Sequence, residues 1–316
     1  GDRNAVTIAA KYQVNDKLSL GVAAYDSGAV HVKYKGAGDT LTPVAFPSLT
    51  FTPDMDGSGP IVNLTSDSIA LLGRYQLNDN LSFMAGARYD TFEVADGDIF
   101  STISGGIPSV QSDSDLVPVA SIAYLNPEIA LRVELLYQGK SSVAMPTTCP
   151  ATPAFGIGCA AGDSTGGLPE FLTLNFQTGI AEDTLLFGSV HKGKWSASQL
   201  SVSDTENVTL IGPTSSFKDS TEYSIGLGRR LTDSLSVSAS YNWDNGPGKT
   251  TDSLFTVANG YKGVSLGAKY TVENIELSAG YNYTQLGDIN YDGASFDNAL
   301  KDNDVKSMGA KVTVRF

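Results

Sequence analysis

Four basic side chains fall on the polar face of segments in which apolar and polar residues alternate: Arg74, Arg88, Arg132 and Lys269. In such a segment every second side chain points to the same side, so all four lie opposite the aliphatic residues. A cation beside an apolar slot could bind the carboxylate of an organic acid. The alternative is that each cation pairs with a neighbouring side chain, as Arg132 could with Glu134.

The residue types that bind metals or form disulfides are few. Cys149 and Cys159 lie ten positions apart in one expected loop. In an oxidising compartment this spacing favours a disulfide that stiffens the loop, with two free thiols as the alternative. A zinc site is not expected, because no histidine lies near either cysteine in the sequence. The stretch Asp-Met-Asp-Gly at residues 54 to 57 is similar to a calcium loop but lacks the other ligands. We therefore expect no metal and no cofactor.

Catalytic groups are equally sparse. His31 and His191 are the two histidines, and they fall on different predicted strands. No spacing of serine, aspartate and histidine suggests a catalytic triad. We expect that the protein is not an enzyme, so the candidate residues would serve binding or passage.

The segment from Leu235 to Trp243 shows the pattern of the elements that carry these residues. Its sequence, LSVSASYNW, places apolar or aromatic residues at odd positions and serine or asparagine between them. A period of two predicts a β-strand with one apolar and one polar face. The turn at Thr232-Asp233 joins this strand to the segment before it as a hairpin.

Most of the chain repeats this hairpin. Tight turns are expected near residues 15, 79, 126, 182, 232 and 273, and long loops at 36 to 63, 97 to 112, 144 to 169, 199 to 219, 246 to 259 and 287 to 303. Alternating short turns and long loops are typical of an antiparallel transmembrane β-barrel of the bacterial outer membrane, with periplasmic turns and extracellular loops. Pro43, Pro47, Pro53 and Pro60 exclude a continuous central strand from the first loop.

Thirteen strands can be counted. Their expected ranges are 4 to 14, 18 to 34, 68 to 77, 81 to 94, 116 to 125, 129 to 143, 171 to 180, 184 to 195, 223 to 231, 235 to 243, 263 to 272, 275 to 286 and 305 to 316. Bacterial single-chain barrels have an even number of strands. We therefore expect 14 strands, with one strand and a leader peptide upstream of Gly1; the alternative is that two strands are merged in this count.

Composition fits one domain over residues 1 to 316. No apolar run approaches the roughly 20 residues of a membrane helix. The net charge of -13 and the lack of a basic stripe argue against nucleic acid as a partner. The charged strand residues fall opposite the aliphatic face, as outer-membrane lipid and lipopolysaccharide would require. In a soluble sandwich a second sheet would cover that face instead.

Several stretches resemble the outer-membrane long-chain fatty-acid transporter family (FadL type). They are YQVNDKLSLGVAAY at 12 to 25, YQLNDNLSFMAGARY at 75 to 89, NPEIALRVELLYQGK at 126 to 140, LPEFLTLNFQTGIAEDTLL at 168 to 186 and RRLTDSLSVSASYNWDNGP at 229 to 247. The final VTVRF, ending at Phe316, looks like the signal that the barrel assembly machinery reads. The resemblance implies 14 strands and an N-terminal plug, which would lie upstream of Gly1.

The resemblance also implies a function. Asp26-Ser27-Gly28 breaks the alternation where this family kinks a strand to open a lateral gap, and an ordinary bulge is the alternative. Phe155, Ile157 and Leu168 place apolar residues in an expected loop, where the family captures substrate. The expectation is passive uptake of a hydrophobic small molecule, such as a long-chain fatty acid, with lateral exit into the outer membrane. The alternatives are a structural or receptor barrel that binds a protein or phage, and an aqueous porin.

Overall fold

The computed structural model describes residues 4–35, 45–46, 49–50, 58–94, 109–148, 162–200, 215–251, 256–291 and 299–315. Its main body is a single antiparallel sheet of 13 strands, in the order β1-β2-β5-β6-β8-β9-β12-β13-β14-β15-β17-β18-β21. Each strand pairs with the main-sheet strands that precede and follow it in sequence, so the sheet is a continuous meander. The predicted all-β, antiparallel fold is confirmed.

The strands of the main sheet are β1 Thr7–Gln13, β2 Leu18–Lys35, β5 Ser58–Gln76, β6 Leu81–Val94, β8 Asp113–Asn126, β9 Leu131–Gln138, β12 Phe171–Ala181, β13 Thr184–Gly193, β14 Ser220–Arg230, β15 Leu235–Asp244, β17 Tyr261–Val272, β18 Ile275–Leu286 and β21 Asp304–Val314. The smaller strands are β3 Ala45–Phe46, β4 Leu49–Thr50, β7 Ser109–Val110, β10 Val143–Thr148, β11 Gly162–Gly166, β16 Thr250–Thr251, β19 Ile289–Tyr291 and β20 Ala299–Leu300. Two 3-10 turns, η1 Pro127–Ile129 and η3 Trp195–Ala197, complete the described elements.

All six predicted tight turns are present between consecutive strands of the main sheet, and side-chain caps fix several of them. The Oδ1 atom of Asn15 accepts the backbone N–H groups of Lys17 and Leu18, and Asn78 does the same for Asn80 and Leu81. Asparagine is favoured in turns because its short side chain bonds the backbone two residues on. The repeated Asn-Asp-x-Leu sequence therefore encodes the same reversal twice.

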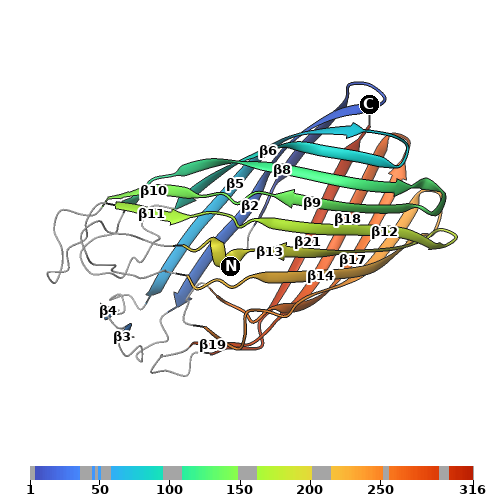
Figure 1. Ribbon diagram of the computed structural model, residues 1–316. Coiled ribbons are helices and arrows are strands. Elements are labelled where there is room, and N and C mark those ends of the chain that lie inside the picture. Colours follow the sequence, from blue (N-terminus) through green and yellow to red (C-terminus); the bar gives the residue numbers. More distant parts are fainter. Residues whose placement is uncertain are drawn as a thin grey trace.

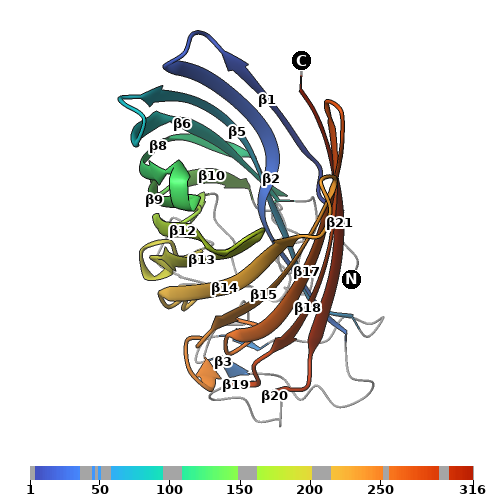
Figure 2. The same ribbon diagram turned by 90° about the vertical axis from the view of Figure 1, so that its right-hand side faces the viewer.

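The sheet curls strongly, so that β1 and β21 come to the same side of the molecule (Figure 1 and Figure 2). No ladder joins these two strands within the described residues, and they form the two edges of the sheet. Within that same part of the chain no helix is long and apolar enough to cross a bilayer.

The two faces of the sheet differ as the alternation predicts. On β5, Leu71 is 63% exposed whereas the preceding Ala70 is 5% exposed. Exposed aliphatic residues such as Ile69, Leu227 and Leu266 lie on the outward face, and Met308 on β21 reaches 86% exposure. So much exposed apolar surface is not stable in water, and it matches a face covered by lipid. Tyr223, Tyr241 and Trp243 stack on this face, at ring-centroid separations of 5.1 and 5.6 Å.

The third strand is longer than predicted. It begins at Ser58 and not at Ser68, so Pro60 lies inside β5 although proline was expected to exclude strand there. The ladder between β5 and β6 starts only at Leu64 with Val94. Within the described residues, Pro60 therefore lies where β5 pairs with β2 alone, and proline is tolerated at such an edge.

The sixth strand is shorter than predicted. It was expected to run from 129 to 143, but β9 ends at Gln138. After the intervening residues the chain forms β10, which pairs with β11 and β7 in a separate three-stranded sheet. The predicted loop at 144 to 169 therefore contains part of a hairpin, which extends beyond β9 and β12 (Figure 1).

Candidate functional site

The predicted break in the second strand is a β-bulge. Asp26 pairs with Asp67 and Gly28 pairs with Ser66, so Ser27 is an extra residue on β2. The Ser27 hydroxyl lies 3.0 Å from the carbonyl oxygen of Ser66 and 2.9 Å from its Oγ atom. The strand continues beyond the bulge to Lys35. We call residues Asp26 to Gly28 the β2 bulge.

The β2 bulge lies at the end of the ladder between β1 and β2. That ladder runs from Gln13 with Ser19 to Thr7 with Tyr25. Beyond Tyr25, within the described residues, β2 is therefore paired only with β5. A bulge at the point where one neighbour ends weakens the wall locally, because a bulge disrupts the ladder.

The β2 bulge also marks the outer limit of the lipid-facing apolar band. Ile69 and Tyr89 are outward and 56% and 47% exposed. The next outward positions along the neighbouring strands are Asp67 and Thr91. Asp26 faces Asp67 directly across the β2–β5 ladder, and like charges placed directly opposite each other are destabilising. The interrupted part of the β2–β5 ladder thus lies at the outer interface.

Leu168 closes the inner side of the β2 bulge. A Cβ atom added to Gly28 would lie 3.4 Å from the Cδ2 atom of Leu168, which is itself 8% exposed. Ser141 holds Leu168 in place: the Leu168 N–H donates to Ser141 Oγ at 2.8 Å, and the Ser141 N–H donates to the Leu168 carbonyl at 3.0 Å. The preceding Gly167 has φ +148, and a Cβ there would overlap the Ser141 carbonyl. Glycine is therefore required for this approach.

Arg88 is the centre of a buried polar cluster beside the β2 bulge. Its Nε and Nη2 atoms bond the two carboxylate oxygens of Asp90 at 2.7 and 2.9 Å, and Nη1 bonds Gln138 at 2.7 Å. Ser68 donates a further hydrogen bond to Asp90, and Tyr25 lies directly opposite Ser68 on the β2–β5 ladder. Arg88 is 2% and Asp90 0% exposed. The cluster ties β2, β5, β6 and β9 together.

The other three predicted cations have separate partners. Arg132 lies 3.0 Å from Glu134, as the alternative interpretation expected. Lys269 lies 3.7 Å from Glu276, which also pairs with Arg315, just after the end of β21. Arg74 donates to the hydroxyl of Ser82. The four cations lie on four different strands and make no contact with one another in the described structure, so they do not form one common carboxylate site.

An apolar inner surface adjoins the β2 bulge. Its buried members are Leu64, Phe92, Val117, Val119, Val143, Met145 and Leu168. They come from β5, β6, β8 and β10 and from the segment that precedes β12. Apolar side chains on the inner face are unlike the polar interior of an aqueous porin.

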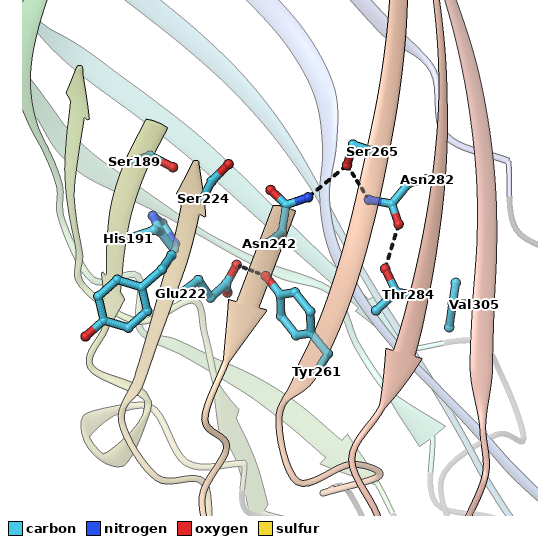
Figure 3. Close-up of a pocket in the computed structure, with 11 residues that line it drawn as sticks. Ser189, His191, Glu222, Ser224, Asn242, Tyr261, Ser265, Asn282, Thr284 and Val305 are labelled. Atoms are coloured by element: carbon cyan, nitrogen blue, oxygen red, sulfur yellow. Dashed lines mark hydrogen bonds between the residues drawn. The ribbon is translucent and has the colours of Figure 1, made fainter. Parts of the chain in front are cut away.

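The inner face of the opposite wall is hollowed and polar. The hollow has a volume of about 510 Å³. Its polar lining comprises Ser189, His191, Glu222, Ser224, Asn242, Tyr261, Ser265, Asn282 and Thr284, from β13, β14, β15, β17 and β18 (Figure 3). We call this site the polar hollow.

Hydrogen bonds order the polar hollow. Asn242 and Asn282 both donate from Nδ2 to the Oγ atom of Ser265, at 2.9 and 2.8 Å, and Thr284 donates to Asn282 Oδ1 at 2.6 Å (Figure 3). Tyr261 donates from its hydroxyl to the Glu222 carboxylate at 2.9 Å. His191 is anchored by Thr173, with Nδ1 to Oγ1 at 2.7 Å.

Several predicted site residues lie outside the described residues. These are Phe155 and Ile157 of the expected substrate groove, Cys149 and Cys159 of the expected disulfide, the 54 to 57 motif, and Phe316. Within the described part of the chain no three His, Cys, Asp or Glu residues come close enough to hold a metal ion.

Sequence reasoning did not identify the polar hollow or the partners of Arg88. A signal was present, because Asn242 and Asn282 both occupy polar positions of alternating strands. The pairing of the strands brings these residues together: Ser265 lies directly opposite Asn282, and its strand β17 lies beside Asn242 on β15. The sequence alone does not give this register. The Arg88–Asp90 pair has the i, i+2 spacing that puts both side chains on one face of a strand, so it could have been found from the sequence.

Comparison with known proteins identifies the fold. No family model matches the sequence, and no curated protein is significantly similar to it. Among solved structures, a FadL homologue from Pseudomonas aeruginosa superposes with a TM-score of 0.67 at 13% identity, covering 97% of this chain and 75% of that one. The toluene transporter TodX of P. putida gives 0.57 at 10% identity, with coverages of 98% and 82%. CymD, a monoaromatic hydrocarbon channel, gives 0.56 at 11% identity, with coverages of 98% and 86%.

These likenesses confirm the FadL-type barrel that the sequence predicted. At such low identities they establish the fold, which is that of bacterial outer-membrane channels.

Proposed function

We propose that this protein is an outer-membrane channel for the passive uptake of hydrophobic small molecules. The observation that carries the proposal is the apolar inner surface beside the β2 bulge, on a sheet whose outer face is apolar as well. Buried Phe92, Val117 and Met145 make this part of the interior apolar, so an apolar molecule that enters it would be in more favourable surroundings than in water. The solved structures with the same fold include a toluene transporter and a monoaromatic hydrocarbon channel, which supports the same class of cargo here.

Cargo would leave sideways through the wall at the β2 bulge. A lateral route spares an apolar chain from crossing the aqueous periplasm, where each exposed methylene costs about 0.8 kcal/mol. The strand pairing is interrupted there, because within the described residues β2 pairs only with β5 beyond Tyr25, and Ser27 is an extra residue in that ladder. Leu168 lies against Gly28 from inside and would have to move aside during passage. Capture by the extracellular loops, including Phe155 and Ile157, remains a prediction from the sequence.

Filling the space beside the β2 bulge should slow uptake. Gly28→Val places a branched side chain against Leu168, where even a Cβ atom is at van der Waals contact. We expect severalfold slower uptake of radiolabelled oleate and toluene by cells that rely on this channel. Gly309→Val is the matched control, since a Cβ on Gly309 meets nothing within 4 Å, and its uptake should equal that of the wild type.

Two outcomes would contradict these proposals. If deleting the gene leaves uptake of both labelled compounds unchanged, the channel proposal fails, and a structural or receptor barrel becomes the better interpretation. If deletion abolishes uptake but Gly28→Val and Gly309→Val behave alike, the protein is a channel whose exit lies elsewhere than the β2 bulge.

A further inference from the structure

Near the outer edge of the lipid-facing band, the interior has an apolar surface on one wall and a polar site on another. The β2 bulge lies just beyond Tyr89 on the outer face. The polar hollow lies at the level of the stacked Tyr223 and Trp243, since Glu222 and Asn242 are their immediate chain neighbours. Interfacial aromatics mark the edge of the apolar band. The apolar inner surface and the polar hollow are thus on different walls of the sheet but near the same outer boundary.

The polar hollow carries negative charge. Glu222 lies directly opposite Asp244 across the β14–β15 ladder, so both carboxylates are on the inner face. His191 lies opposite Glu222 on the other side, and no lysine or arginine is among the described residues that line the hollow. Arg88, on the opposite wall, is already held in a bidentate pair with Asp90. A ligand carboxylate entering this site would meet like charge, with no lysine or arginine among the described lining residues to offset it.

The hollow suits a neutral hydroxyl instead. Ser265 Oγ accepts hydrogen bonds from both Asn242 and Asn282, so its own proton is left to donate elsewhere. Glu222 accepts from Tyr261 through Oε2, and an ionised carboxylate has further lone pairs for a second donor. A hydroxyl group can accept from Ser265 and donate to a carboxylate oxygen, whereas a carboxylate can only accept.

We propose that the polar hollow binds the head group of an amphipathic cargo and selects a neutral hydroxyl over a carboxylate. The cargo class is then a hydrophobic alcohol or phenol, whose apolar part lies toward the apolar inner surface and the β2 bulge. This inference rests on the proposed channel function and narrows its substrate. It runs against the example of a long-chain fatty acid that the family resemblance implies.

The test compares 1-decanol with decanoate on purified full-length protein in detergent, by isothermal titration calorimetry at about pH 8.5, where carboxylates are ionised. The quantity measured is the ratio of the two dissociation constants, because partition into micelles cancels when variants are compared. We expect wild-type protein to bind decanol more tightly. Glu222→Gln keeps an oxygen for Tyr261 but removes the charge, and should shift the ratio toward decanoate by about tenfold.

Two further variants separate a charge effect from damage to the fold. Asn282→Asp adds a carboxylate to the hollow and should shift the ratio the other way. Glu182→Gln makes the same substitution as the first variant in the exposed turn at the far end of β13, and should leave the ratio unchanged.

The proposal is overturned if wild-type protein binds decanoate as tightly as decanol, or if neither Glu222→Gln nor Asn282→Asp moves the ratio. Cellular uptake of labelled toluene tells this failure from failure of the channel itself. If toluene uptake is normal while the ratio of dissociation constants does not respond to either substitution, the proposed head-group site is wrong but the channel proposal stands. If wild-type protein binds neither probe and uptake is absent, both proposals fall.

Discussion

Among single residues, Arg88 and Asp90 should matter most for stability. A buried ion pair is costly to break from one side, because the remaining charge is left without a partner, and the loss is typically about 3 to 5 kcal/mol. Asp90 is fully buried and also accepts from Ser68. We therefore expect Asp90→Asn to lower the free energy of unfolding by roughly 3 kcal/mol in urea titrations of the protein in lipid vesicles.

An exposed ion pair provides the comparison. Arg230 pairs with Asp183 at a turn, with 58% and 33% of the two side chains exposed. Exposed pairs contribute about 0 to 1 kcal/mol, so Asp183→Asn should cost no more than that; asparagine also tolerates the positive φ of this position. Equal losses for the two variants would show that the Arg88 cluster contributes no more to stability than a surface pair.

The same residues show what the sequence could not provide. The alternation placed Arg88 on the inner face correctly, because face assignment needs only a period of two. Its partners depend on which strands become neighbours and in what register: Gln138 is 50 positions away, on β9. Contact of Leu168 with substrate stays a prediction, but its position against Gly28, where Ser141 holds it, could not be predicted. Such contacts between distant segments leave no local pattern.

At the scale of elements, the single extra residue of β2 can be removed without disturbing the pairing that follows. Asp26 pairs with Asp67 and Gly28 with Ser66, so deleting Ser27 would join two registers that are already continuous. We expect the deletion to give a regular β2, with unchanged or increased stability and slower uptake of labelled toluene. Faster or unchanged uptake would contradict a role for the bulge in exit.

A deletion within the regular part of the same strand gives the contrast. Ala23 pairs with Ala9 on one side and Ala70 on the other. Removing it shifts the register by one, which moves every later inward side chain of β2 to the lipid face. This variant should fail to assemble, as judged by the loss of folded protein in the outer membrane.

Element ends were less predictable from the sequence than element centres. The strand from 275 to 286 and the strand from 81 to 94 were predicted with their exact observed bounds. In these strands the outward apolar positions run from the turn as far as Tyr89 and Tyr283 without interruption. The errors at β5 and β9 arose where a strand continues with one neighbour or bends into another sheet. Pairing on one side removes the constraint that made Pro60 look incompatible with a strand.

For the whole molecule, every proposal depends on lipid covering the aliphatic outer face. Leu71 and Leu72 are adjacent on β5, near the middle of the part that is paired on both sides, and they point outward and inward respectively. An arginine facing the bilayer midplane costs about 2 to 4 kcal/mol, whereas a residue facing the interior of a barrel can extend into water. We therefore expect Leu71→Arg to lower the unfolding free energy in lipid vesicles by about 2 to 4 kcal/mol, and Leu72→Arg to lower it less.

Which of Leu71→Arg and Leu72→Arg lowers the unfolding free energy more tests which face of the sheet meets lipid. If a second protein layer covered the outward face, as in a soluble sandwich, the chain would stay folded and monomeric in buffer without detergent. In that case the lipid-dependent difference between Leu71→Arg and Leu72→Arg would vanish. A larger cost for Leu72→Arg would mean that the inner face is the packed one and the interior holds no passage, which would remove the basis for both the channel and the head-group site.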